Sequence, residues 1–226
     1  MTKNVDYKAS DYHKQRHPEF FDNKDLYSAW GYFAKQTYFS DLDIAGKRIL
    51  EYGGALGYNL QQLKVDANVS MIEPSDIGRD FAVAHGIESY RSAKELTGQV
   101  FDIVLCRHVL EHIHDPLNAL KEMNSLLVEG GCLILVLPIE RQNLKIDDND
   151  LNHHLFAWNA QTIINLTKLA GFEKDAIRYE YYGLRRKLLP LYRSMGGQCY
   201  ARAIRLVGRC LQFRELVVLA HKSEVE

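Results

Sequence analysis

Three histidines and two acids lie within ten residues of each other in the stretch RHVLEHIHDP, residues 107–116. His108, Glu111 and His112 have the H-x-x-E-H spacing of an inverted zinc-peptidase motif. That chemistry needs a long helix that presents both imidazoles, and a third ligand further along the chain. Here a buried strand pattern, FDIVLC, precedes the motif and an Asp-Pro pair stops it, so only one helical turn fits. We therefore disfavour a zinc peptidase.

A second pair, His153-His154, lies in the loop that is expected to follow the fifth strand. If the two sets of histidines met, they could hold a metal, but no ligand spacing supports this and we predict no metal site. An imidazole at either place could instead take a proton from a hydroxyl or amine nucleophile. We predict His112 and His154 as candidate bases. The alternative for Glu111 and His112 is purely structural hydrogen bonding of their own loop.

Apolar runs alternate with helical patterns along most of the chain. The expected strands are 48–52, 69–74, 87–90, 100–106, 132–138, 172–182 and 213–221. The expected helices are 57–65, 76–86, 115–131 and 159–171, with a long loop at 139–156. Because the central strands are apolar throughout, they are typical of a parallel sheet with both faces covered. We predict an α/β fold: a doubly wound, Rossmann-like, mostly parallel sheet with an antiparallel last strand.

The whole chain, 1–226, is expected to form one domain in three parts. Residues 1–45 would be a helical lead-in that acts as a lid. Residues 46–182 and 213–221 would form the core, and 183–212 a basic helical insertion before the last strand.

A glycine-rich loop follows the first expected strand in ILEYGGALGYN. Glu51, Gly53, Ala55 and Gly57 have the spacing E-x-G-x-[GA]-x-G, in which glycines allow a ligand to approach the backbone closely. Glu73 ends the second strand about 20 residues later, where a carboxylate can accept both hydroxyls of a ribose. The loop lacks the G-x-G-x-x-G spacing of dinucleotide sites. An acid before the loop suits a cation better than a phosphate, so a nucleoside with a positive amino-acid end fits.

These motifs, with MIEPS, FDIVLCRHVLEHIHDP and LLVEGGCLILVLP, resemble those of class I S-adenosylmethionine-dependent methyltransferases. The closest likeness is to small bacterial enzymes with an L-E-H…D-P signature after the fourth strand. Ala55 departs from the pattern, since a middle glycine usually stands there. The resemblance implies S-adenosyl-L-methionine as the cofactor. It implies the following cofactor-binding residues: Glu51, Gly53, Gly57, Glu73, Pro74, Arg91, Ser92, Cys106, Arg107, His108, Tyr12 and Arg16. In this set Tyr12 and Arg16 belong to the lid.

Basic residues are concentrated between 178 and 214, where Glu180 is the one acid. Arginines favour phosphate and carboxylate groups, so this segment could recognise an anionic acceptor. It could also be a solvated helical face, or contact anionic lipid, since apolar and basic residues interleave.

The bulk composition excludes several classes of function. Formal net charge is −1, which argues against nucleic acid as a partner. We find no signal-peptide pattern and no apolar run long enough to span a membrane. The four cysteines form no C-x-x-C pair, which is typical of reduced thiols in a cytoplasmic protein. Oligomeric state is not readable from the sequence.

We predict a methyltransferase that acts on oxygen or nitrogen of a small-molecule or glycan-type acceptor with anionic character. The alternative is a nucleoside-binding protein of the same fold without catalysis. A nicotinamide-dependent oxidoreductase is disfavoured by the loop spacing.

Overall fold

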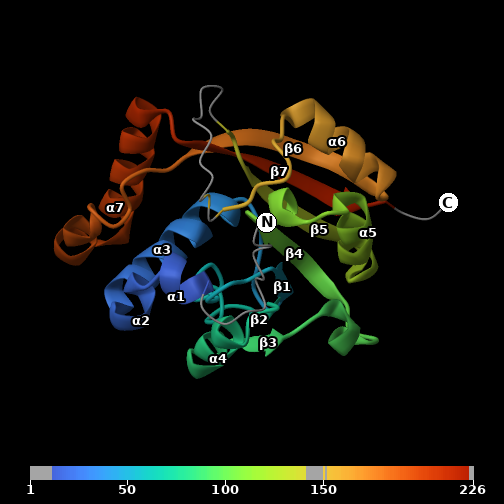
Figure 1. Ribbon diagram of the computed structural model, residues 1–226, viewed down its shortest axis with the longest axis horizontal. Helices are drawn as coiled ribbons and strands as arrows, with labels where there is room; N and C mark the ends of the chain where they lie inside the picture. The colour runs from blue at the N-terminus through green and yellow to red at the C-terminus, as the bar shows by residue number, and fades with distance from the viewer. Residues whose placement is uncertain (1–11, 141–149, 151, 224–226) are drawn as a thin grey trace.

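The computed structural model describes residues 12–140, 150 and 152–223. A seven-stranded sheet in the order β3-β2-β1-β4-β5-β7-β6 forms its centre (Figure 1). The strands are β1 (Arg48–Tyr52), β2 (Asn68–Ile72), β3 (Glu88–Tyr90), β4 (Phe101–Arg107), β5 (Leu127–Pro138), β6 (Phe172–Tyr181) and β7 (Arg214–Lys222). β1 to β5 pair in parallel, and β7 lies antiparallel between β5 and β6. The predicted fold class, including the antiparallel last strand, is confirmed.

Helices cover both faces of the sheet. They are α1 (Tyr12–Arg16), α2 (Glu19–Asp22), α3 (Lys24–Tyr38), α4 (Asp76–Ala84), α5 (Pro116–Ser125), α6 (Ala160–Leu169) and α7 (Leu189–Leu211). Short 3₁₀ turns lie at Ala93–Leu96 and Leu110–His112. Figure 1 shows α5 and α6 on one side of the sheet and α3 with α7 on the other. None of the helices within the described ranges is long and apolar enough to cross a membrane.

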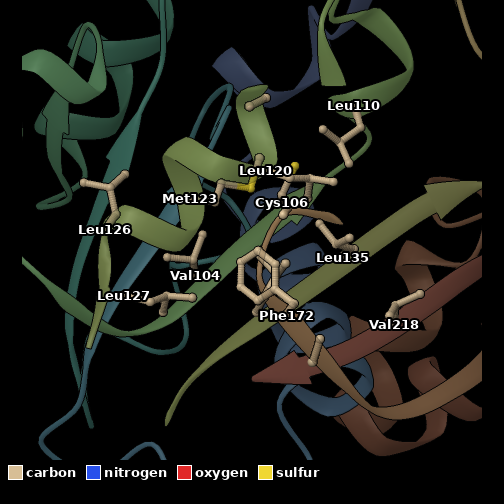
Figure 2. Packing of buried hydrophobic residues seen from close by; sticks show 14 of the residues in the cluster. Val104, Cys106, Leu110, Leu120, Met123, Leu126, Leu127, Leu135, Phe172 and Val218 are labelled. Carbon is tan, nitrogen blue, oxygen red and sulfur yellow. The ribbon is translucent and has the colours of Figure 1, made fainter. Parts of the chain in front are cut away.

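The central strands are buried on both faces, as their apolar sequences predict. On β4, Val104 packs with α5 and α6 on one face, while Ile103 and Leu105 join the cluster under α3 and α4 on the other. Figure 2 shows the first of these clusters, in which Phe172 of β6 lies close to the side chains beneath α5. This two-sided packing holds the carboxyl ends of β1, β2 and β4 at one edge.

Helix α5 begins as predicted but ends earlier. The Asp115 side chain accepts from the amide of Asn118, and Pro116 occupies the first turn. The sequence predicted a helix up to the glycine pair at 130–131, whereas the helix ends at Ser125 and β5 begins at Leu127. Leu127 pairs with Phe101 of β4 and is buried, so sheet pairing outweighs the helical pattern there.

The prediction of a helix over 57–65 was also wrong. This segment forms successive turns, closed by bonds such as Leu60 N to Gly57 O. Lys64 N to Leu60 O is the one bond of helical spacing within it. The apolar spacing was genuine, because Leu60 and Leu63 are fully buried. Periodicity indicated which side chains face inward but not the backbone conformation.

A buried ionic network joins α3, β4 and β7. Arg107 donates to the Tyr38 hydroxyl at 2.9 Å, to the Tyr58 hydroxyl at 3.3 Å and to Glu215 at 3.3 Å. Tyr38 also donates a short hydrogen bond to Glu215. Burial alone would raise the pKa of Glu215, but Arg107 and His108 outweigh it and lower that pKa to about 2. The network ties the antiparallel β7 to the end of β4 across β5.

We expect Glu215→Gln to destabilise the protein by about 3–5 kcal/mol at pH 7, because Arg107 would stay buried without a counter-charge. The folded-state pKa of Glu215 lies below its ordinary value of 4.5. Its stabilisation is therefore complete above pH 4.5 and is lost as the pH falls toward 2. Urea unfolding between pH 7 and pH 2 measures both effects. The matched control, Glu173→Gln on exposed β6, should change stability by less than about 0.5 kcal/mol. Equal effects of the two variants would contradict the assignment.

Candidate active site

A cavity of about 820 Å³ opens at the carboxyl ends of β1, β2 and β4, the usual ligand position in such sheets. Most of the predicted site residues line it: Tyr12, Glu51, Gly53, Glu73, Pro74, Arg91, Ser92, Arg107, His108, His112 and His154. Gly57 and Cys106 do not line it. Arg16 ends α1, and its side chain lies outside the described part of the structure. Most of the residues predicted for the site are therefore brought together in one cavity wall, and their roles stay predictions.

Two glycines of the loop after β1 allow different close contacts. Gly53 has φ +77°, and a Cβ there would lie 2.5 Å from Cγ2 of Val109, another cavity residue. Gly57, with φ +75°, instead allows the loop to pack on Ile87 beneath β3. Ala55 adopts φ +50°, a left-handed conformation that glycine takes more easily. Ala55 therefore adopts the left-handed backbone conformation that a glycine would adopt at this position.

Glu73 is buried and holds the glycine loop. One oxygen accepts from the amide of Ala55 at 2.8 Å, and the other from the amide of Ser75 at 2.8 Å. The imidazole of His13, on α1, lies 3.3 Å from the second oxygen. Two carboxylate oxygens can accept about four hydrogen bonds, so capacity remains for a ligand. Sequence reasoning named Tyr12 and Arg16 in this helix but missed His13, which no spacing distinguished.

Glu51 is buried at the end of β1, and one of its two carboxylate oxygens has no hydrogen-bond partner among the described residues. Asn59 Nδ2 donates to Oε1 at 2.5 Å, while Oε2 has no partner among the described residues. Burial raises the pKa of Glu51 to about 8, against the opposing effects of Asn59 and Arg107. An unpaired buried carboxylate oxygen facing a cavity is suited to a cationic donor. Asn59 was missed by the sequence analysis because it lies in the irregular 57–65 segment.

The end of β4 turns sharply at His108. Its φ is +53°, and Nε2 lies 3.0 Å from Glu215. Burial, and then Arg107, lower the pKa of His108 to about 4. Cys106 before it points into the core under α5, where burial raises its pKa well above the ordinary value. The predicted approach of this segment to the cofactor therefore depends on Arg107 and His108 rather than on Cys106.

Glu111, His112 and His154 meet at the cavity wall. One potential ligand atom from each lies within 4.8 Å of the others. Burial raises the pKa of Glu111 to about 8, and burial with the nearby His154 lowers that of His112 to about 4. His154 also makes a short hydrogen bond through Nδ1 to Glu140. The two predicted bases are thus adjacent, with ring centroids 4.8 Å apart.

Arg185 is the one basic residue after position 178 that lines this cavity. It is buried, and its guanidinium lies 4.4 Å from the Trp30 ring, 4.9 Å from Tyr182 and 5.0 Å from Phe33. No hydrogen bond or ion pair of its guanidinium occurs among the described residues. Aromatic faces stabilise the cation without neutralising it.

Other arginines of this region attach α7 and its flanks to the N-terminal helices. Arg193 pairs with Asp25 at 2.6 Å, Arg186 with Glu19 at 2.9 Å, and Arg205 donates to the Gln36 carbonyl at 2.9 Å. Part of the basic segment is therefore engaged within the protein.

Comparisons with known proteins agree on the family to which this chain belongs. A family model described as a methyltransferase domain matches residues 12–177. A tRNA U34 carboxymethyltransferase from Helicobacter hepaticus is 28% identical over 73% of this chain and 58% of its own length. A ubiquinone biosynthesis O-methyltransferase from Pseudomonas aeruginosa is 33% identical over 41% of this chain and 44% of its own length. The chain thus spans about half the length of the curated relatives it matches.

Among solved structures, phosphoethanolamine N-methyltransferase 2 from Haemonchus contortus, in complex with S-adenosyl-L-methionine, superposes with a TM-score of 0.63. The identity is 15%, with 99% of this chain and 61% of that chain covered, so the likeness concerns the fold. This chain belongs to the methyltransferase domain family, within the class I S-adenosylmethionine-dependent methyltransferases. The Oε2 atom of Glu51, which has no partner among the described residues, lies in the cavity wall and fits the cofactor of that class.

We expect Gly53→Ala to destabilise the protein by about 1–3 kcal/mol more than Gly98→Ala. Both residues have φ +77°, so both variants carry the same backbone strain, but only the first places a methyl group against Val109. Denaturant unfolding of the two variants measures the difference. The double variant Gly53→Ala with Val109→Ala should recover part of the loss. Equal destabilisation of the two single variants would contradict the close approach.

Proposed function

We propose that this protein transfers the methyl group of S-adenosylmethionine to an oxygen or nitrogen of a small-molecule or glycan-type acceptor that carries an anionic group. The observation that carries the proposal is the unpaired Oε2 of Glu51 beside the glycine loop. A buried carboxylate oxygen there calls for a donor such as an amino-acid ammonium group. Membership of the methyltransferase family supports the same cofactor.

In this proposal the residues of the cavity bind and orient. Glu51 takes the ammonium group, and Glu73 uses its remaining capacity for the ribose hydroxyls. Arg91 and Ser92 flank the adenine, Tyr12 covers the methionine end, and Gly53 lets the glycine loop pack against Val109 in the cavity wall. The cofactor supplies an electrophilic methyl group on a sulfonium, which is already a good leaving group. The protein therefore contributes mainly by alignment in a cavity shielded from water.

The acceptor is proposed to lie between Arg185 and the paired histidines. The cationic guanidinium of Arg185, enclosed by Trp30 and Tyr182, supports an acceptor with a carboxylate or phosphate group and a flat or apolar body. For a hydroxyl acceptor, His112 and His154 are the residues positioned to assist removal of the proton. A neutral amine would need alignment alone.

The prediction that nucleic acid is not an acceptor stays a prediction, since one relative is named for tRNA. This prediction is supported by three arginines of the basic segment that have partners within the protein: Arg193, Arg186 and Arg205. Peripheral contact with anionic lipid is a second candidate for the exposed basic residues, because Leu206 and Met195 of α7 are exposed among them.

Calorimetric titration of S-adenosylhomocysteine into chelator-treated protein tests the cofactor site. We expect micromolar binding, weakened about 10- to 100-fold in Glu73→Gln, because one charged acceptor of ribose hydroxyls is lost. The control Glu88→Gln, at the exposed end of β3, should bind like the natural protein. Absence of binding by the natural protein would remove the methyltransferase proposal. Binding without methyl transfer to any acceptor would favour the non-catalytic alternative.

Arg185→Met tests the acceptor site. A panel of small hydroxyl and amine compounds, with and without a carboxylate or phosphate, would be assayed by release of S-adenosylhomocysteine. We expect kcat/KM to fall about 10- to 100-fold for anionic acceptors and to change little for neutral ones, because a charged hydrogen bond is lost. Arg186→Met, at the neighbouring exposed arginine, is the control. A uniform loss across the panel would contradict anion recognition.

A further inference from the structure

Glu111, His112 and His154 form a cluster whose ligand geometry differs from that of the linear motif. The first two come from the 3₁₀ turn after β4, and His154 from the segment after β5. One nitrogen or carboxylate oxygen of each lies within 4.8 Å of those of the other two. A cation placed among them could reach all three at about 2.0–2.2 Å with small side-chain adjustments. All three side chains line the cavity.

The Glu111 carboxylate is the strongest sign that something is bound there. Its side chain is fully buried. Apart from an interaction with its own amide, neither oxygen has a hydrogen-bond partner among the described residues. A buried carboxylate without donors is costly, and natural proteins rarely keep one without a ligand or a catalytic use. The Nε2 atom of His112 lies 3.9 Å from Oε1, which is beyond hydrogen-bond distance.

Hydrogen-bond partners outside the cluster orient the imidazoles of His112 and His154. Nδ1 of His154 is hydrogen-bonded to Glu140, which leaves Nε2 as its other possible ligand atom. The ring of His112 hydrogen-bonds with backbone groups of Asn152 and His153. Histidines that bind metals commonly have their second nitrogen fixed by a carboxylate or a backbone carbonyl in this way. The cluster thus has outer partners as well as ligands.

We propose that Glu111, His112 and His154 bind a divalent first-row transition-metal cation in the wall of the cavity. Two imidazoles and one carboxylate suit such ions better than Ca²⁺ or Mg²⁺, which prefer oxygen ligands alone. Three protein ligands leave coordination positions open toward the cavity, as in catalytic sites. The sequence analysis predicted no metal, because H-x-x-E-H had no suitable helix and no ligand spacing linked it to His153-His154. The first histidine of that motif, His108, is in fact directed to Glu215 and lies outside the cluster.

The proposed role of this cation rests on the proposed function. An acceptor hydroxyl bound at an open position would lose its proton to solvent more readily. Its oxygen would then form a bond to the methyl carbon while the carbon–sulfur bond breaks. The electron pair stays on sulfur, which gives neutral S-adenosylhomocysteine, a methyl ether and one released proton. His112 and His154 would act through the cation instead of serving as the base themselves.

The test is metal binding by the full chain, read independently of activity. Chelator-treated protein would be titrated with Co²⁺, followed by its visible absorption and by metal analysis after gel filtration. We expect one Co²⁺ per chain. His154→Ala should weaken binding by at least about 100-fold, and Glu140→Gln, which removes an outer partner, by about 10- to 100-fold.

The control is His153→Asn, which removes a neighbouring histidine outside the cluster and suits the positive φ of that residue. It should bind Co²⁺ like the natural protein. No saturable binding by the natural protein, or equal affinity in His154→Ala, would overturn the proposal. Circular dichroism of each variant verifies that it is folded. Binding of S-adenosylhomocysteine to the same chelated sample reports on the cofactor site alone, so failure of the metal site and failure of the proposed function are distinguishable.

Discussion

The buried pair of Arg107 and Glu215 is the interaction on which the arrangement of the site depends. β7 is reached only after the long helix α7, and it enters the sheet antiparallel between β5 and β6. Glu215, near its start, meets Arg107 at the end of β4 and the hydroxyl of Tyr38 from α3. Because a buried charge without its partner is strongly unfavourable, these elements can meet in essentially one register. That register sets the turn at His108, and with it the direction of the loop that carries Glu111 and His112.

Three buried acids line the cavity and a fourth, Glu215, contacts Arg107 and His108 of its wall; the four differ in how far the protein satisfies them. Glu215 has a guanidinium, a phenol and an imidazole, and Glu73 has two amides and an imidazole. Within the described residues, Glu51 has one amide donor and one oxygen without a partner, and neither oxygen of Glu111 has a side-chain partner. Since burial penalises each carboxylate, the unsatisfied ones indicate where a ligand completes the site. In this series Glu215 is fully paired within the protein, Glu73 retains some capacity, and Glu51 and Glu111 are the two acids with the most capacity for a ligand.

The sequence predicted what depends on local rules and on the order of elements. The strands, the glycine loop and the acid after β2 follow from apolar runs and turn residues, and parallel strands bring their ends to one edge. The missed contacts join segments that are far apart in the chain. His13 meets Glu73, and Arg185 meets Trp30, only because the N-terminal helices fold over the cavity. No hydrophobic periodicity or residue spacing in the sequence predicts contacts of this kind. The helix predicted over 57–65 failed for a related reason, since burial was encoded there but backbone geometry was not.

The histidine-rich stretch illustrates why a linear motif is a weak guide to a site. Its spacing suggested that His108 and His112 act together on one helix, yet the positive φ at His108 turns the two rings toward different partners. His108 completes the ionic network with Glu215, whereas His112 lies beside His154 from another loop. A single residue in a left-handed conformation therefore divides the stretch into a part joined to Glu215 and a part beside His154, although both parts line the cavity. The chemistry of the second part is set by a residue that the motif does not contain.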